Sequence, residues 1–408
     1  MRGSAEPSPE APAPRGGARL AAWLGLERNV VAVSAAMFAM ALGEEMWKRF
    51  LPKYLEALGA PIVAIGAYGT AKDFLDGIYQ YPGGWIADRY GRRRALLLFV
   101  GLAAIGYAII AAAPVWPVVL VGLVFTMAWT SMASPSLFAV IGDALPRHRR
   151  AMGFSIQSIL RRIPIVVAPT IGGLLIAAWG VRTGVRGGLV CSIVLAWATL
   201  AVVSRIRLAL PEGGGGISIR GVWHRLPKPL RRLLVSDIFI RTCEGLVDVF
   251  LVIYALNVIG IDPPHYGLLI AVQTATAIAC YLPVARMADR IGRKPFVIAT
   301  FLAFSLFPIA VIASRSFPAL VLAFVVGGLR EIGEPARKAL IVDLAEPAIR
   351  ARSIGLYYLI RSVAVAPAAT VGGLLWSTAP AIPFIAAGLV GLIGTALFAL
   401  TVHERDAG

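Results

Sequence analysis

Four charged side chains share one face of a mainly apolar segment near the middle of the chain. This segment, 233–258, is expected to be helical, and its charges recur at i, i+4, i+7 and i+11: Asp237, Arg241, Glu244 and Asp248. Residues at this spacing line one side of an α-helix. In a membrane, four lipid-facing charges would cost roughly 10–14 kcal/mol, at ~2.5–3.5 kcal/mol each on insertion scales. We therefore expect this face to point into a hydrated cavity or towards partner side chains.

Three further apolar segments, 29–55, 61–87 and 317–343, also carry charges. In chain order these are Glu44, Glu45, Lys48 and Arg49, then Lys72, Asp73 and Asp76, then Arg330, Glu331, Glu334, Arg337 and Lys338. We expect each of these helices to be polar on one side. Arg49, Arg337 and Lys338 lie near segment ends, where long basic side chains are expected to snorkel to an interface.

The carboxylates in these segments have the surroundings that proton transfer requires. Burial favours the neutral form of a carboxyl group, whereas a nearby cation favours the charged form, so changes in access can load or release a proton. The candidates are Glu44, Glu45, Asp73, Asp76, Glu244 and Glu334. The first choices are Glu44 and Glu244, because they occupy equivalent positions in the internal repeat described below.

Two arginines lie about nine residues into their segments, which places them near mid-depth. Arg161 follows Gln157 and Ser158 by one turn, and Arg361 follows Tyr357 and Tyr358 in the same way. A guanidinium with such neighbours can clamp a carboxylate, a phosphate or a planar molecule. Alternatively, each arginine holds helices together through a permanent ion pair, with Asp73, Glu244 and Glu331 as possible partners.

The composition explains why so many charges lie in apolar segments. The 408 residues include 39 basic and 22 acidic ones, for a net charge of +17, yet only 15% are charged and 58% are apolar. A soluble protein of this size could not bury so much apolar surface. We expect an integral membrane protein, with anionic lipid at the cytoplasmic face rather than nucleic acid as the partner of its basic loops.

The spacing of cysteine and histidine predicts neither a disulfide framework nor a metal site. Without a catalytic or phosphate-binding motif, we expect no enzyme activity and no bound cofactor.

Segments long enough to span about 30 Å of hydrocarbon recur along the chain. Twelve are predicted, at 29–55, 61–87, 94–113, 116–143, 152–178, 184–205, 233–258, 266–288, 295–313, 317–343, 353–377 and 380–402. Basic residues gather in alternate loops, which predicts that both termini are cytoplasmic. The expected organisation is a disordered tail (1–28), a six-helix bundle (29–205), a cytoplasmic linker (206–232), a second six-helix bundle (233–402) and a short tail (403–408). The fold class is therefore all-α and membrane-spanning.

The two predicted bundles arise from an internal repeat. A shift of 200 residues matches Glu44 to Glu244, Arg161 to Arg361, and the run at 172–175 to that at 372–375. A shift of 201 places the loop at 87–92 over that at 288–293. Repeats of this kind predict two pseudo-symmetric bundles around a central path.

The loop Gly84-Trp-Ile-Ala-Asp88-Arg89-Tyr-Gly91-Arg92-Arg93 closely resembles the loop motif of the major facilitator superfamily, and its second copy, 285–294, differs only in having Ala285 for the first glycine. The resemblance implies twelve helices in two bundles. It also implies a latch on the inner gate, in which Asp88 faces a helix N-terminus and Arg92 pairs with Asp143. The residues of this gating motif are Gly84, Asp88, Arg89, Gly91, Arg92 and Asp143, with Asp289, Arg290, Gly292, Arg293 and Asp343 in the second copy. The alternative is a solvated basic turn that only sets topology.

Residues 168–173 resemble the antiporter motif of the same superfamily, with Ala168 in place of its first glycine. Pro169 can bend the helix, and Gly172 and Gly173 allow another helix to approach closely. The resemblance implies export in exchange for protons, whereas the alternative is a simple packing device. Segment 119–142 lacks the arginine that drug antiporters usually carry there.

Taken together, the motifs and the repeat predict a monomeric secondary transporter in the plasma membrane, most simply a bacterial inner membrane. We expect alternating access and proton-coupled efflux of a small organic molecule, driven by the proton gradient. The substrate or proton path is predicted to include Glu44, Glu45, Asp73, Asp76, Arg161, Arg241, Glu244, Asp248, Arg330, Glu331, Glu334 and Arg361. One alternative is proton-coupled uptake of an organic anion or metabolite. Another is a membrane sensor that transports nothing.

Overall fold

A computed structural model describes residues 28–133, 150–205, 227–344 and 350–402, and the described chain is almost entirely helical. The N-terminal half contains α2 (Arg28–Trp47), η1 (Lys48–Phe50), α3 (Leu51–Ala57), α4 (Ile62–Tyr90), α5 (Arg92–Ala112), α6 (Trp116–Met127), η2 (Ala128–Met132) and α8 (Arg150–Val203). Helix α8 contains two passes, because Gly180 has φ 78° and ψ 166° and breaks the helical path. A positive φ at this sharp bend suits glycine, which has no Cβ.

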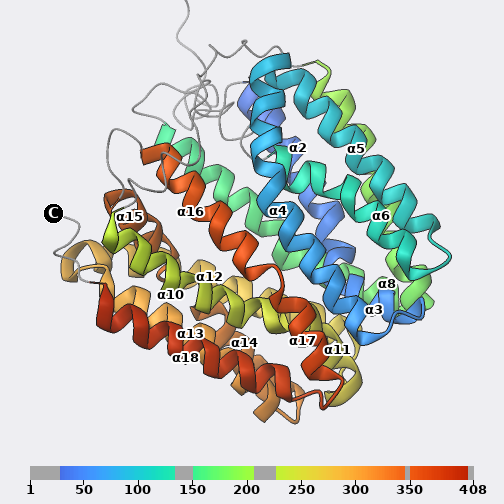
Figure 1. Ribbon diagram of the computed structural model, residues 1–408. Helices are drawn as coiled ribbons and strands as arrows, with labels where there is room; N and C mark the ends of the chain where they lie inside the picture. Colours follow the sequence, from blue (N-terminus) through green and yellow to red (C-terminus); the bar gives the residue numbers. More distant parts are fainter. Residues whose placement is uncertain (1–27, 134–149, 206–226, 345–349, 403–408) are drawn as a thin grey trace, which may run out of the picture.

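The C-terminal half repeats this arrangement (Figure 1). It contains α10 (Lys228–Val247), η4 (Asp248–Phe250), α11 (Leu251–Ile253), η5 (Tyr254–Ile259), α12 (Pro263–Ile291), α13 (Lys294–Ala313), α14 (Phe317–Leu329), α15 (Glu334–Leu344), α16 (Arg350–Val365), α17 (Ala368–Trp376) and α18 (Ile382–Thr401). With the short helices read as continuations of their neighbours, each half forms a bundle of six passes. The all-α fold with two six-helix bundles is thus confirmed.

Six segments of the described chain are long and apolar enough to cross a membrane by composition alone. They are Arg92–Ala112, Arg162–Val203, Lys228–Ile259, Lys294–Ala313, Ser353–Trp376 and Ile382–Thr401, with two shorter apolar stretches at Trp116–Met132 and Phe317–Leu329. Helix α4 fails this criterion despite its 29 residues. Lys72, Asp73 and Asp76, which line the interior cavity described below, account for the difference.

The outer surface and the interior carry side chains in the manner of a membrane protein. On the outside, Trp197, Leu322 and Leu400 are 66%, 70% and 75% exposed. On the inside, charged groups such as Asp237 and Arg337 are buried. Lipid solvates an apolar surface, whereas charges in a bundle must find partners within the protein.

The backbone repeats with the spacing found in the sequence. Gly59 and Gly260 have φ values of 85° and 81°, and Gly91 and Gly292 have φ values of 85° and 96°. Both pairs are separated by 201 residues. The breaks at η1 and η4 also begin 200 residues apart, at Lys48 and Asp248. The repeat is therefore present in the turns and helix breaks as well as in the motifs.

Contacts between helices repeat in the same way. Gly172 packs against the main chain of Met46, and Gly372 packs against the main chain of Leu246. Likewise, Gly173 meets Pro263 from the other half, and Gly373 meets Val63. Each of these contacts maps onto its counterpart when both residues shift by 200. The two bundles are therefore related by pseudo-symmetry in their packing as well as in their helix order.

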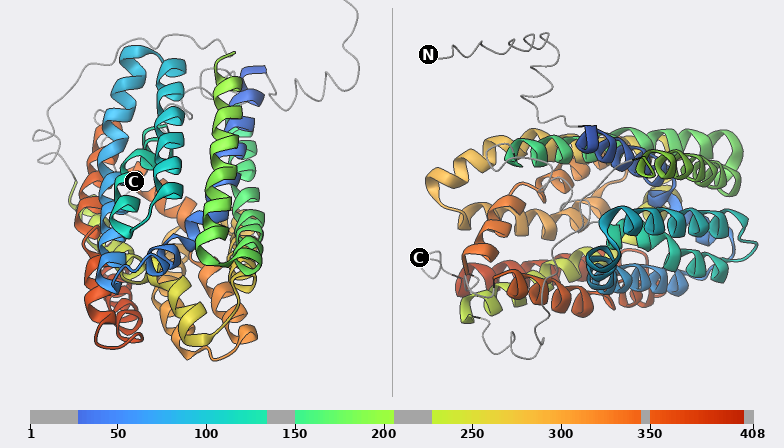
Figure 2. Two further views of the ribbon diagram at one scale, coloured as in Figure 1. Left: turned by 90° about the vertical axis from the view of Figure 1, so that its right-hand side faces the viewer. Right: turned by 90° about the horizontal axis from the view of Figure 1, so that it is seen from above.

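The two halves meet closely at the end that carries α3 and η5 (Figures 1 and 2). Asn257 Nδ2 donates to Glu56 Oε1 at 2.7 Å, and Lys53 donates to Asn257 Oδ1. Lys53 also pairs with Glu56 at 2.5 Å. Phe50 and Tyr266 add an edge-on ring contact across the same boundary, with 5.7 Å between centroids. These contacts close the two bundles against each other at this end of the molecule.

Several predicted boundaries differ from the observed helices. The α-helical part of segment 116–143 ends at Met127 and continues in the π-helical η2, while 134–149 lies outside the described residues. Segment 317–343 is broken between α14 and α15. Segment 353–377 is broken before α17, where Pro367 lacks an N–H donor. Helix α10 starts at Lys228, within the predicted linker. The two predicted tails lie almost wholly outside the described residues.

Candidate functional site

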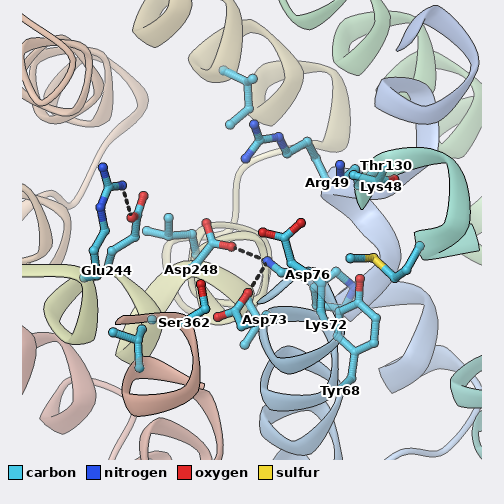
Figure 3. A pocket seen from close by; sticks show the side chains of 18 of the residues that line it. Lys48, Arg49, Tyr68, Lys72, Asp73, Asp76, Thr130, Glu244, Asp248 and Ser362 are labelled. Atoms are coloured by element: carbon cyan, nitrogen blue, oxygen red, sulfur yellow. Dashed lines mark hydrogen bonds and ion pairs between the residues drawn. The ribbon is translucent and has the colours of Figure 1, made fainter. Parts of the chain in front are cut away.

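A cavity of about 440 Å³ lies between the two halves (Figure 3). Most of its wall comes from η1, α4 and η2 on one side and from α10, η4, α12 and α16 on the other, with single residues from α3, α6, α11 and the break between α14 and α15. Its charged lining residues are Lys48, Arg49, Lys72, Asp73, Asp76, Arg241, Glu244, Asp248, Arg330 and Arg361. Tyr68, Met127, Tyr266 and Ile270 provide aromatic and apolar surface. The predicted polar sides of the charged segments therefore meet around one space, whose size suits a small organic ligand.

One ion pair joins the halves inside this cavity. Lys72 Nζ of α4 lies 3.0 Å from Asp248 Oδ2 of η4 and 3.5 Å from Asp73 Oδ1 on its own helix. Figure 3 shows Lys72 between these two carboxylates. The sequence placed Lys72 on a polar helix face, but its pairing across the bundles was not predicted. Residues on different halves show no sequence signal for such a contact.

A second group of charges belongs to the C-terminal half. Arg241 lies 2.9 Å from Glu244 and also contacts Glu334. Glu244 lies 3.7 Å from Arg330, whose guanidinium stacks over the ring of Phe307 at 4.4 Å. Glu244 thus reaches the cavity between two arginines. An anionic group of a ligand in the cavity can compete with this carboxylate for its arginine partners.

Behind this wall lies a buried charge cluster centred on Asp237, which is 0% exposed. Its Oδ2 accepts hydrogen bonds from Arg337 at 2.6 Å, Tyr357 at 2.9 Å and Arg361 at 3.2 Å. Arg337 also donates to Glu334 at 2.8 Å. Three donors on one carboxylate oxygen make this cluster a cross-link between α10, α15 and α16.

The cluster corrects two expectations. Arg337 does not snorkel to an interface, because it is 2% exposed and held by Asp237 and Glu334. Arg361 is ion-paired, but its partner is Asp237 rather than Asp73, Glu244 or Glu331. It still lines the cavity and stacks over Tyr358 at 4.7 Å. Arg49 also stays within the protein, since it lines the cavity and pairs with Glu45 at 3.3 Å. Lys338 is exposed.

Glu44 occupies a different environment from its repeat partner Glu244. It is 7% exposed and accepts hydrogen bonds from Tyr107 at 2.8 Å and Thr130 at 3.1 Å. The residues that line the cavity include Thr130 but not Glu44. The sequence did not identify Tyr107 and Thr130 as its partners, because isolated hydroxyl residues on other helices carry no distinguishing pattern.

The remaining path residues are distributed around the cavity or near it. Asp76 lines it and accepts a hydrogen bond from Ser131 at 2.6 Å. Glu331 lies 3.6 Å from Arg162, a contact between the two halves. The side chain of Arg161 lies outside the described part of the structure. No group of three or more acids, histidines or cysteines that could hold a metal occurs among the described residues.

The gating motif is only partly described. In its second copy Arg293 donates to Asp343, which is the contact that the resemblance implies. Arg89 stacks over Trp85, with its guanidinium 5.5 Å from the ring centroid. Asp143 lies outside the described residues, as do the side chains at positions 84, 88, 289 and 290. Gly91 and Gly292 form the turns that begin α5 and precede α13.

The antiporter-like motif at 168–173, in α8, lies at close helix contacts. Gly172 meets Met46 of α2, Gly173 meets Pro263 of α12, and Gly267 of α12 meets the carbonyl of Pro169. A Cβ at any of these glycines would collide with the main chain of the neighbouring helix. The motif therefore serves close packing, including packing between the halves, and any role in antiport would act through that contact.

The sequence and the fold were compared with protein families, curated proteins and solved structures, and each comparison found similar proteins. The family model described as Major Facilitator Superfamily matches residues 33–253 and 233–408. An uncharacterized MFS-type transporter of Methanocaldococcus jannaschii is 20% identical over 376 residues, covering 90% of this chain and 93% of that protein. Multidrug resistance protein MdtH of Photorhabdus laumondii is 24% identical over 354 residues, covering 83% and 86%. A crystal structure of a POT family transporter in complex with 5-aminolevulinic acid has a TM-score of 0.76 at 16% identity, covering 91% and 96%.

Proposed function

Because this chain belongs to the major facilitator superfamily, we propose that it exports small organic molecules in exchange for protons, by alternating access of the cavity between its two bundles. The observation that carries the proposal is the cavity itself. It lies between pseudo-symmetric halves, and its wall combines ion pairs with aromatic surface. A site between two bundles can face either side of the membrane when the bundles rock.

Two observations favour export. MdtH, a multidrug resistance protein, resembles this chain along most of both lengths. Residues 168–173 of α8 resemble the antiporter motif and lie at contacts between the halves, where a change of packing would accompany rocking. The orientation with both termini in the cytoplasm follows from the basic loops. Anionic lipids at that face, and protons as the coupling ion, complete the proposal.

The experiment is flux in reconstituted vesicles. Vesicles holding purified protein and a pH-sensitive dye receive an imposed pH gradient, followed by a panel of aromatic amines, acids and zwitterions. Under the proposal, at least one compound dissipates the gradient as it moves against the proton flux. Protein-free vesicles are the control. Transport without proton movement would contradict the coupling.

Proton-coupled uptake is the second candidate function. Six of the charged residues that line the cavity are basic, namely Lys48, Arg49, Lys72, Arg241, Arg330 and Arg361. Basic groups favour a ligand with an anionic group, as expected for an organic anion or metabolite. The same vesicles separate the candidates, because uptake moves substrate and protons in one direction and export moves them in opposite directions.

A further inference from the structure

Two charged groups that line the cavity have no oppositely charged group within 4.0 Å among the described residues. Most charged residues of the lining have an oppositely charged group within 4.0 Å. They are Arg49, Lys72, Asp73, Arg241, Glu244, Asp248, Arg330 and Arg361. Among the described residues of the lining, Lys48 and Asp76 do not. Asp76 accepts one hydrogen bond, from the Ser131 hydroxyl at 2.6 Å. An unpaired charge at membrane depth is costly, which makes it a candidate for ligand recognition.

The surroundings of Lys48 show why it stays unpaired. The two acids nearest to it in sequence are engaged elsewhere. Glu44 is held by the Tyr107 and Thr130 hydroxyls, and Glu45 pairs with Arg49. For Asp76, the nearest lysine in sequence is Lys72, which pairs with Asp73 and Asp248. Lys48 still interacts electrostatically with the Glu44 carboxylate, but over more than the 4.0 Å of an ion pair. Lys48 and Asp76 are thus the charged groups of the described lining that no direct ion pair holds.

Both groups face the same cavity from the N-terminal half. Lys48 belongs to η1 and Asp76 to α4, and Figure 3 shows both in the lining. The same cavity also has aromatic and apolar surface. It comes from Tyr68 and Met127 of the N-terminal half and from Tyr266 and Ile270 of the C-terminal half. A ligand with an apolar body and two opposite charges would match this lining.

From these contacts we infer that the substrate is a small zwitterion, whose anionic group binds Lys48 and whose cationic group binds Asp76. This inference rests on the proposed transport function and specifies its substrate class. A singly charged ligand would leave one of the two residues unmatched, whereas a zwitterion matches both and adds no net charge. The paired groups of the C-terminal half need not rearrange for binding.

The test is binding to the purified full-length protein in detergent, without any gradient. The probes are triplets that share one ring and differ in charge, such as tryptophan, tryptamine and indole-3-propionate, or phenylalanine, phenethylamine and hydrocinnamate. We expect thermal stabilisation by zwitterions and little by the singly charged members. Equal stabilisation by an amine or an acid, or no stabilisation by any member, would overturn the inference.

Variants identify the two contacts. Lys48→Gln and Asp76→Asn should each weaken zwitterion binding about tenfold, since a hydrogen bond to a charged group is lost. Lys48→Gln should leave amine binding unchanged, and Asp76→Asn should leave acid binding unchanged. Lys48→Arg keeps the charge and should keep zwitterion binding. Lys338→Gln and Asp262→Asn, which change exposed residues outside the lining, are the matched controls. Unchanged zwitterion binding in both variants would refute the assignment.

Failure here is distinguishable from failure of the proposed function. Loss of charge selectivity in detergent with intact flux in vesicles would remove the zwitterion assignment alone. Selective binding of zwitterions without flux would remove the transport proposal and keep the binding site.

Discussion

Lys72 and Asp248 lie 3.0 Å apart and connect the two bundles within the cavity. Their side chains are 24% and 36% exposed, so water partly screens the pair. A partly exposed ion pair of this kind contributes little free energy and can therefore break at low cost when the bundles move.

The first prediction concerns the strength of this pair. A double-mutant cycle of Lys72→Gln and Asp248→Asn should give a coupling energy of ~0.5–1 kcal/mol, the upper part of the range for solvated pairs. The measurement is the free energy of unfolding in detergent. The pair Lys338→Gln and Asp262→Asn, whose members lie outside the cavity lining, should be additive. Additivity for Lys72 and Asp248 as well would show that the pair contributes nothing to the bundle contact.

The sequence predicts which side chains of one helix face the cavity, but it does not predict their partners on other helices. Helix faces were predictable, because i, i+4 and i+7 spacing fixes which side chains of one helix lie together. The partners were not, because Asp237 with Arg337 and Lys72 with Asp248 are 100 and 176 residues apart. The symmetry of the repeat also did not indicate how the surroundings of equivalent residues differ. It placed Glu44 and Glu244 at equivalent positions, whereas Glu44 accepts hydrogen bonds from Tyr107 and Thr130 and Glu244 lines the cavity beside two arginines.

The second prediction concerns the buried cluster around Asp237. Arg337→Met should lower the free energy of unfolding by about 3 kcal/mol, because removing one partner leaves buried carboxylates under-compensated. Arg361, 3.2 Å from Asp237, limits the loss. Adding Asp237→Asn should recover part of it, since the amide carries no charge. Lys338→Met, an exposed neighbour, is the control. An Arg337→Met protein as stable as that control would contradict the cross-linking role of the cluster.

The third prediction uses the repeated glycine contacts. Gly172→Ala and Gly372→Ala should each cost about 1–3 kcal/mol of stability, because the new methyl group meets the main chain at Met46 or Leu246. Gly101 and Gly355 have open space at the same position. Alanine there should be neutral or stabilising by up to about 1 kcal/mol, as helix propensity predicts. Thermal unfolding of the four variants compares them directly, and equal costs at all four sites would contradict the packing argument.

The last prediction separates the two acids that the repeat made equivalent. Glu244 reaches the cavity between Arg241 at 2.9 Å and Arg330 at 3.7 Å, where a substrate can meet it, and we propose it as the proton carrier of the coupled transport. Glu244→Gln fixes this position in a neutral form. In vesicles, the variant should still exchange substrate, but its transport rate should lose the pH dependence of the unmodified protein, and substrate should no longer move protons.

Glu44→Gln should behave differently, because Glu44 is absent from the described lining and is held by two hydroxyls. We expect it to lower stability through the altered hydrogen bonds and to keep the pH profile. Asp262→Asn, which removes an exposed carboxylate outside the cavity lining, is the control for the loss of an acidic group. A flat pH profile in Glu44→Gln with a normal one in Glu244→Gln would reverse the assignment. Proton coupling would then run through the buried hydroxyl cluster of the N-terminal bundle instead of through the arginine-lined wall of the cavity.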